Sequence, residues 1–350
     1  PLATGIEHTH RDDAGELVTR CNRSLDRAER DGFDVLLEQQ REWLDDFWER
    51  SDVELFRAGD NHPSRNDEPT LRGLADQQAV RWNLFQLAQA SAQHVEQGIA
   101  AKGVTGGGYE GHYFWDTEMY VVPFLAYTQP VAARQLLRFR WRMLSIARER
   151  ARALNQDGAL YPWRTINGEE ASAYYAAGTA QYHINAAIAY GLERYLNATG
   201  DIELLAGEGA EILVETARAY EDLGFYALNG DGVGDGKFHI HSVTGPDEYT
   251  TVVNDNTYTN LMARFTMRYA ATSVTSLQEW DPAAYDTLVR RTRVTDDEIA
   301  GWHRACDAMY IPYDDELGIH PQDEAFLDRE RWDFDGTPDE HYPLLLHYHP

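Results

Sequence analysis

Lysine and cysteine are both scarce in this sequence. Lys102 and Lys237 are the only lysines among 31 basic residues, which face 58 acidic residues and give a formal net charge of -27. This balance argues against nucleic-acid binding and attraction to anionic membranes, because both need clustered positive charge. A dispersed acid excess with little lysine is typical of proteins from salt-loving microorganisms, where salt screens the self-repulsion. We therefore expect a halophilic protein without nucleic-acid or membrane partners.

The two cysteines, Cys21 and Cys306, lie far apart and form no Cys-x-x-Cys or Cys/His ligand spacing. We therefore expect neither a disulfide framework nor a bound metal. The sequence has no secretory signal at its start and no apolar run of about 18 residues, which favours a cytoplasmic protein. It opens on Pro1 and stops in mid-pattern at Pro350, so we expect a fragment of a longer protein.

Helical periodicity dominates the chain from residue 70 onward. Amphipathic patterns predict helices at about 32–49, 70–95, 120–127, 130–154, 174–198, 201–223, 256–279 and 295–309. Strand patterns are few: residues 15–21 suggest an extended piece, and residues 238–243 alternate weakly, as in a hairpin. Consecutive amphipathic helices predict an all-α fold, in which a toroid of paired helices would gather alternate loops at one end. We expect a site at that end.

The loops between the predicted helices carry aromatic residues next to charged ones. Trp115 and Asp116 place a stacking face beside a carboxylate that can accept hydrogen bonds from two hydroxyls. Trp163, Arg164 and Glu169 add a second aromatic face, a guanidinium donor and an acid. Such groups suit a sugar ligand. Each of these residues, taken singly, is also consistent with a helix cap, a core aromatic or a surface position.

His183 lies in the polar motif of residues 181–185, inside a predicted helix. One turn later the helix carries Ala186 and Ala187, so His183 either faces a pocket or is a hydrogen-bonded histidine of the core. The core position is the more common one for a histidine on an apolar helix face.

Residues 244–250 place two carboxylates directly after a Gly245-Pro246 turn. Proline fixes φ and glycine tolerates unusual conformations, so the turn can hold an acid rigidly, as general acid catalysis requires. Taken alone, the stretch is more often a surface turn with a capping acid. The sequence has no Gly-x-Ser-x-Gly elbow and no phosphate-binding P-loop. Carboxylates recurring with Trp and Tyr therefore favour glycoside chemistry.

Four motifs of this chain resemble those of glycoside hydrolase family 65, in the family's order and at about its spacings. They occupy residues 111–118, 161–165, 181–185 and 244–249. The resemblance runs from about residue 30 to the end of the chain. The family contains inverting phosphorylases of α-linked glucose disaccharides and some hydrolases. Residues 163–181 look closer to the kojibiose and trehalose phosphorylase branch than to maltose phosphorylase.

The resemblance implies a domain organisation. It predicts an (α/α)6 barrel of the six-hairpin glycosidase type, preceded by a β-sandwich domain and a helical linker. In this chain, residues 1–31 would be the end of the sandwich, 32–69 the linker, and 70–350 the catalytic barrel, truncated at its C-terminal end. Phosphorylases of the family are commonly dimers, so the resemblance also implies a homodimer.

The resemblance assigns roles to individual residues. It places the catalytic general acid on Glu248, and leaves its neighbour Asp247 a structural role. The residues expected to bind substrate are Trp115, Asp116, Trp163, Arg164, Glu169 and His183. Trp115 and Asp116 fall where the family holds glucose in the subsite of bond cleavage, and Trp163 falls near the neighbouring sugar.

The implied reaction is phosphorolysis of a kojibiose- or trehalose-type disaccharide to β-glucose 1-phosphate and glucose. Its partners are the disaccharide and inorganic phosphate, and it needs no cofactor. Two alternatives stay open, namely an inverting α-glucoside hydrolase on the same fold and an inactive or non-catalytic carbohydrate-binding fragment. In the family, the residues that distinguish phosphorolysis from hydrolysis lie beyond the position of Pro350.

Overall fold

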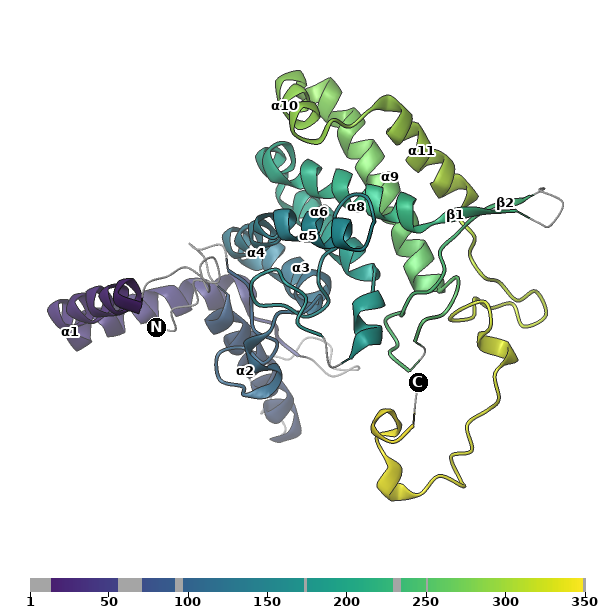
Figure 1. The fold of residues 1–350 in the computed structure, drawn as a ribbon. Helices are drawn as coiled ribbons and strands as arrows, with labels where there is room; N and C mark the ends of the chain where they lie inside the picture. Colours follow the sequence, from purple (N-terminus) through teal and green to yellow (C-terminus); the bar gives the residue numbers. More distant parts are fainter. Residues whose placement is uncertain are drawn as a thin grey trace, which may run out of the picture. The chain divides into compact units, whose positions relative to one another are not determined.

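A computed structural model describes residues 14–55, 71–91, 97–172, 175–228, 234–249 and 251–348 of the chain (Figure 1). The described part is mostly helical, as predicted. The main helices are α1 (Ala14–Ser51), α2 (Leu71–Ala90), α3 (Val122–Thr128), α4 (Pro130–Arg142), α5 (Leu144–Ala153), α6 (His183–Thr199), α7 (Ile202–Leu204), α8 (Ala210–Leu223), α9 (Thr257–Trp280), α10 (Pro282–Thr292) and α11 (Asp296–Ala308). The chain divides into two compact units, Pro1–Phe139 and Arg140–Pro350, and each is described by itself.

In the first unit, α1 corrects one expectation from the sequence. Residues 15–21 are helical rather than extended, because strong helix formers outnumber the β-branched Val18 and Thr19 in this stretch. The helix is interrupted at Gly32, whose backbone angles are φ 74° and ψ 169°. Glycine adopts this conformation without strain, whereas a residue with a Cβ atom would be strained there. The interruption coincides with the predicted start of the linker, although the domain boundary itself stays a prediction.

The second unit is built around α9. This helix packs against α6, α8, α10 and α11 (Figure 1). Its buried face is made largely of small and flexible apolar residues, which let neighbouring helices approach closely. These residues are Ala263, Met267, Ala270, Ala271, Val274 and Leu277. Helix α8 is buried along most of its length, so it forms the interior layer of this unit.

Several predicted helix boundaries shift in the second unit. The predicted helix 174–198 begins only at His183, after a short 3₁₀ segment at Ala176–Ala180. The predicted helix 201–223 contains a π-helical segment, Leu205–Gly209, that carries two glycines. Helix α10 was not predicted, although Asp281 caps it by accepting a hydrogen bond from the Ala284 N–H group and Pro282 starts it.

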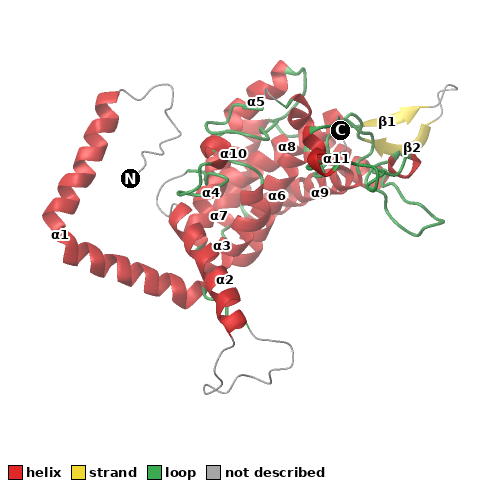
Figure 2. Cartoon of the chain, turned by 90° about the horizontal axis from the view of Figure 1, so that it is seen from below, coloured by secondary structure: helices red, strands yellow, loops and turns green. Residues whose placement is uncertain are grey.

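A hairpin of β1 (Phe225–Leu228) and β2 (Gly234–His239) follows α8 (Figure 2). The observed strand β2 therefore begins and ends earlier than the predicted strand 238–243, and the two overlap only at residues 238 and 239. Further along, Val243 and Val253 form an antiparallel bridge with N···O distances of 2.9 and 2.8 Å. This bridge closes the base of the loop at residues 244–252. None of the described helices is long and apolar enough to cross a membrane.

Candidate active site

The loop at residues 244–252 is anchored at its first two residues. The Thr244 N–H group donates to the Ala180 carbonyl at 3.0 Å, which ties the loop to the segment before α6. Gly245 packs against the amide of Asn256, where an added Cβ would lie 2.4 Å from Nδ2. A larger residue at position 245 would therefore push the loop away from the start of α9. These contacts explain why the turn needs glycine and how it fixes the acids that follow.

Glu248, the predicted general acid, is half-buried and held by two neighbouring side chains. The Gln181 amide donates from Nε2 to Glu248 Oε1 at 2.8 Å, and the Tyr175 hydroxyl donates to the Glu248 backbone carbonyl at 3.3 Å. Burial and the nearby charge of Glu248 raise the pKa of Tyr175, so its phenol stays protonated as a donor. Because Gln181 donates to Oε1, Oε2 is the oxygen that can carry a transferable proton.

His183 orients the amide that contacts Glu248. Its Nε2 lies 3.1 Å from Gln181 Oε1. Burial lowers the pKa of His183 to about 3, although a hydrogen bond with the Gly245 backbone opposes the shift, so the imidazole is neutral at pH 7. In the tautomer that carries its single proton on Nε2, the ring donates to Gln181 Oε1 and the Gln181 NH₂ group is turned toward Glu248. His183 is fully buried, and this position gives no support to the direct substrate contact that we expected.

The buried His183 should make stability depend on pH. Its pKa is 6.5 as an ordinary histidine and about 3 in the folded chain. Between these values the unfolded chain binds a proton that the folded chain does not, so the free energy of unfolding falls as the pH falls. One proton contributes up to about 1.4 kcal/mol per pH unit. Urea unfolding at pH 4 to 7 should therefore show a shallower pH slope for His183→Gln than for the unchanged protein.

The matched control for this measurement is His303→Gln, because His303 is exposed on α11. It should leave the slope unchanged. Equal slopes for His183→Gln and the unchanged protein would contradict the assignment of a neutral, buried imidazole.

The loop that carries Trp163 is organised by Glu170. Glu170 Oε2 accepts a hydrogen bond from the Trp163 N–H group at 2.8 Å, and Oε1 accepts from the Arg164 N–H group at 3.2 Å. Ser172 Oγ also donates to Oε1, at 2.8 Å. One carboxylate thus satisfies two backbone donors and one hydroxyl, which fixes the loop conformation at the predicted binding residues.

Arg150, on α5, holds Glu170 from the other side. Its Nη1 lies 3.1 Å from Glu170 Oε2 and donates to the Tyr161 carbonyl at 2.9 Å, and its Nη2 donates to the Thr179 carbonyl at 3.2 Å. Burial lowers the pKa of Arg150, and the Glu170 charge opposes that shift. Arg150 therefore joins Tyr161 to Thr179 through its two hydrogen bonds to backbone carbonyls.

Trp163 is wedged within this segment. Its ring meets the Tyr175 ring edge to face, with centroids 5.8 Å apart. Gly178 allows this packing, because a Cβ there would lie 2.7 Å from the indole. Tyr175 in turn donates to the Glu248 carbonyl, so the structure connects the Trp163 loop and the Glu248 loop through one tyrosine.

The other predicted residues of the Trp163 loop differ in exposure. The Arg164 side chain is buried, whereas Glu169 is exposed and accepts a hydrogen bond from the Asn167 amide at 3.1 Å. Glu169 is accessible to a ligand, but Glu170 is the acid that shapes the loop. The role of Glu170 was not assigned from the sequence, because the two adjacent acids cannot be distinguished by residue type.

Trp115 and Asp116 lie in the first unit, immediately before a π-helical turn, Thr117–Val121. Trp115 is half-exposed and Asp116 is exposed, whereas Tyr113 and Glu118 are buried and hydrogen-bonded to each other. The buried pair fixes the backbone that presents Trp115 and Asp116 to solvent. A binding role for both residues is compatible with this exposure and stays a prediction.

A helical domain that presents a loop-borne carboxylic acid beside aromatic side chains has the features of a glycoside-processing domain. Residues 81–350 match the family model described as "Glycosyl hydrolase family 65 central catalytic domain". The chain therefore belongs to glycosyl hydrolase family 65, which confirms the family predicted from the four motifs.

The chain is similar to proteins described as trehalose and kojibiose phosphorylases. It is 50% identical to an alpha,alpha-trehalose phosphorylase from Geobacillus stearothermophilus, over 91% of this chain and 39% of that protein. It is 46% identical to an alpha,alpha-trehalose phosphorylase from Thermoanaerobacter brockii, over 96% of this chain and 41% of that protein. A solved structure from human microbiome, named as a kojibiose phosphorylase, superposes with a TM-score of 0.80 at 30% identity, covering 96% of this chain and 42% of that one.

These similarities bear on the fold and on the extent of the chain. The superposition supports the predicted helical fold of the six-hairpin glycosidase type. The chain spans about two-fifths of the length of the curated relatives it matches.

Proposed function

We propose that this chain is the catalytic part of an inverting disaccharide phosphorylase, in which Glu248 is the proton donor. The observation that supports the proposal most strongly is the hydrogen bond from the Gln181 amide to Glu248 Oε1, at 2.8 Å. Glu248 lies on a loop that is closed by the backbone bridge between Val243 and Val253. Membership of family 65 and similarity to phosphorylases support the same reaction class.

In the proposed mechanism, Glu248 transfers the Oε2 proton to the glycosidic oxygen. The bond between that oxygen and the anomeric carbon breaks, its electron pair stays on the oxygen, and glucose leaves. A phosphate oxygen attacks the anomeric carbon from the opposite face, so the product is β-glucose 1-phosphate. Gln181 stabilises the carboxylate that remains, since a hydrogen bond strengthens when its acceptor becomes charged. Glu248 then regains a proton from solvent.

The proposed reaction uses phosphate as its co-substrate and needs no cofactor. The phosphate brings its own negative charge and nucleophilic oxygen, so a second carboxylate is not required as a base. An inverting hydrolase would need such a base to activate water on the face of the sugar opposite the general acid.

We propose trehalose as the first substrate to test and kojibiose as the second. The two trehalose phosphorylases named above are 50% and 46% identical to this chain, whereas the kojibiose phosphorylase structure is 30% identical. Both sugars contain an α-linked glucose, so Glu248 would protonate an equivalent oxygen in each.

Phosphate dependence tests the reaction class. The complete protein should cleave trehalose when phosphate is present, and removal of phosphate should abolish cleavage. Coupled detection of glucose and glucose 1-phosphate measures both products. Equal cleavage without phosphate would favour the hydrolase, and sugar binding without turnover would favour a non-catalytic protein.

A further inference from the structure

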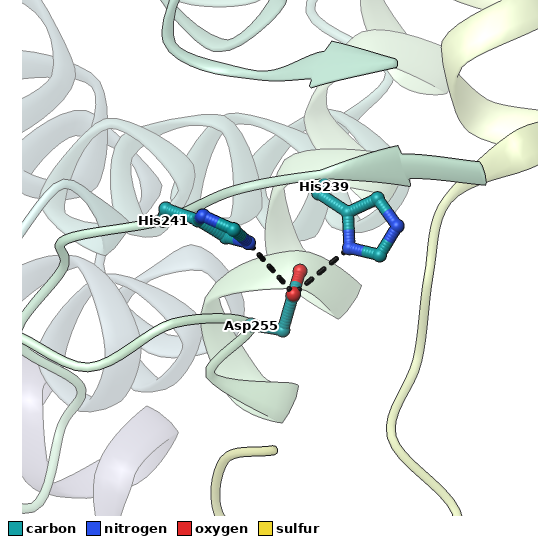
Figure 3. A group of neighbouring side chains, drawn as sticks. All are labelled: His239, His241 and Asp255. Atoms are coloured by element: carbon teal, nitrogen blue, oxygen red, sulfur yellow. Dashed lines mark hydrogen bonds and ion pairs between the residues drawn. The ribbon is translucent and has the colours of Figure 1, made fainter. Parts of the chain in front are cut away.

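A second polar cluster lies where β2 ends and α9 begins. It consists of His239, His241 and Asp255 (Figure 3). Asp255 Oδ2 lies 2.9 Å from His239 Nδ1 and 3.2 Å from His241 Nε2. Each of the three residues offers one ligand atom, and these atoms all lie within 4.8 Å of one another.

Asp255 is fixed by the fold rather than by the two histidines alone. It is fully buried, and its Oδ1 accepts hydrogen bonds from the Ile240 N–H group at 3.2 Å and the Asn260 amide at 3.0 Å. Its φ of 48° lies in the left-handed region, which non-glycine residues seldom adopt without a local reason. The scaffold thus directs Oδ2 at the two imidazoles.

His239 has the outer hydrogen bond that metal-binding histidines commonly have. Its Nε2 lies 3.0 Å from Asp235 Oδ2. When Nε2–H donates to this carboxylate, the lone pair of Nδ1 points toward Asp255. The His239 ring also packs against Tyr310, with centroids 4.8 Å apart, which limits its rotation.

The charge balance of the cluster favours a cation. Burial and the neighbouring Asp255 raise the pKa of Glu324, so Asp235, Asp255 and Glu324 place three acidic groups near the two imidazoles. In the described part of the chain, the ion pairs of Asp255 are with imidazoles. Asp255 is the buried one of these acids, and a buried carboxylate needs compensating positive charge. Protonated rings can provide it, and so can a divalent metal ion.

We propose that His239, His241 and Asp255 bind one transition-metal dication of the zinc class. Two imidazole nitrogens with one carboxylate oxygen suit zinc, whereas magnesium and calcium prefer oxygen ligands alone. Ligand atoms around tetrahedral zinc are roughly 3.3 Å apart. The two N···O separations, 2.9 and 3.2 Å, are already close to this value. The ligand nitrogens of the two histidines lie within 4.8 Å of each other, and the rings would move together to close on the ion. Glu324 supplies a further oxygen nearby.

The proposed ion has a structural role and is independent of the proposed function. It would join the end of β2 to Asp255, two residues before α9, close to the bridge between Val243 and Val253 that closes the catalytic loop. Its binding would stabilise the folded chain, because the unfolded chain does not hold the three ligands together.

Metal content and thermal stability test the proposal. The complete protein is treated with a chelator and then dialysed against micromolar Zn²⁺, or against Mg²⁺ as the control ion. We expect one equivalent of zinc per chain, no retained magnesium and a higher Tm with zinc. Co²⁺ in place of zinc should give the visible absorption of a tetrahedral site with nitrogen and oxygen ligands.

Two variants locate the ion. His241→Ala removes a half-buried ligand and should lose the bound zinc and the zinc-dependent rise in Tm, whereas His303→Ala changes an exposed histidine and should keep both. Circular dichroism checks that each variant is folded. The proposal is overturned if the unchanged protein retains no zinc, or if folded His241→Ala retains a full equivalent. If His241→Ala does not fold, the zinc content and the Co²⁺ spectrum of the unchanged protein decide.

Discussion

Replacing Glu248 with glutamine in the complete protein is expected to lower kcat/KM for disaccharide phosphorolysis by about 100- to 10,000-fold, the usual contribution of a general acid. Glutamine keeps the size of the side chain and can still accept from the Gln181 amide, but it has no acidic proton for the leaving oxygen. The loss should shrink sharply with α-glucosyl fluoride, whose leaving group does not need protonation. Initial rates on both substrates measure this difference.

The matched control is Asp247→Asn, because Asp247 serves the loop itself. Its Oδ1 accepts from the Tyr249 N–H group at 3.1 Å, and its Oδ2 accepts from the Gln322 amide at 3.1 Å. Asparagine keeps an acceptor for the Tyr249 N–H group, so the activity should change little on either substrate. Near-full activity of Glu248→Gln on the disaccharide would remove Glu248 from the role of proton donor.

Replacing Glu170 with alanine is expected to destabilise the second unit by about 3–5 kcal/mol, because it leaves the positive charge of Arg150 buried and unpaired. The two side chains are 14% and 13% exposed, so solvent compensates only partly. The backbone N–H groups of Trp163 and Arg164 also lose their acceptor. Urea unfolding, with the m-value checked, measures the loss.

The adjacent acid provides the control for this prediction. Glu169→Ala removes an exposed carboxylate from the same loop and should change the free energy of unfolding by no more than about 0.5 kcal/mol. If the two variants were equally stable, Glu170 would not have the structural role that its contacts indicate.

The helical fold could be predicted because its signals are local. The capping box of Thr295 and Glu298 begins α11 within one residue of the expected start, and the apolar period of α9 fixed both ends of that helix within one residue. The break at Gly32 and the delayed start of α6 were less visible. They depend on glycine geometry and on the packing of Trp163 against Gly178, which a helical period does not record.

The sequence points to a candidate site residue only where that residue stands inside a motif, and the catalytic role of Glu248 stays a prediction. Glu248 follows the Gly245-Pro246 turn, and the close contact of Gly245 with Asn256 explains why this turn needs glycine. Gln181 is 67 residues away from Glu248, so no local pattern reveals that its amide contacts the acid. His239, His241 and Asp255 likewise meet only after the chain has passed through the catalytic loop. The sequence-based expectation of no metal rested on the absence of a Cys-x-x-Cys or Cys/His ligand spacing.

The anomeric configuration of the sugar phosphate tests the central claim most directly. Proton and phosphorus NMR of the complete protein with trehalose and phosphate should show β-glucose 1-phosphate accumulating together with one equivalent of glucose, and no product without phosphate. This result follows from protonation by Glu248 on one face of the sugar and attack by phosphate on the other. Formation of α-glucose 1-phosphate, or of glucose alone at the same rate in both conditions, would contradict the account.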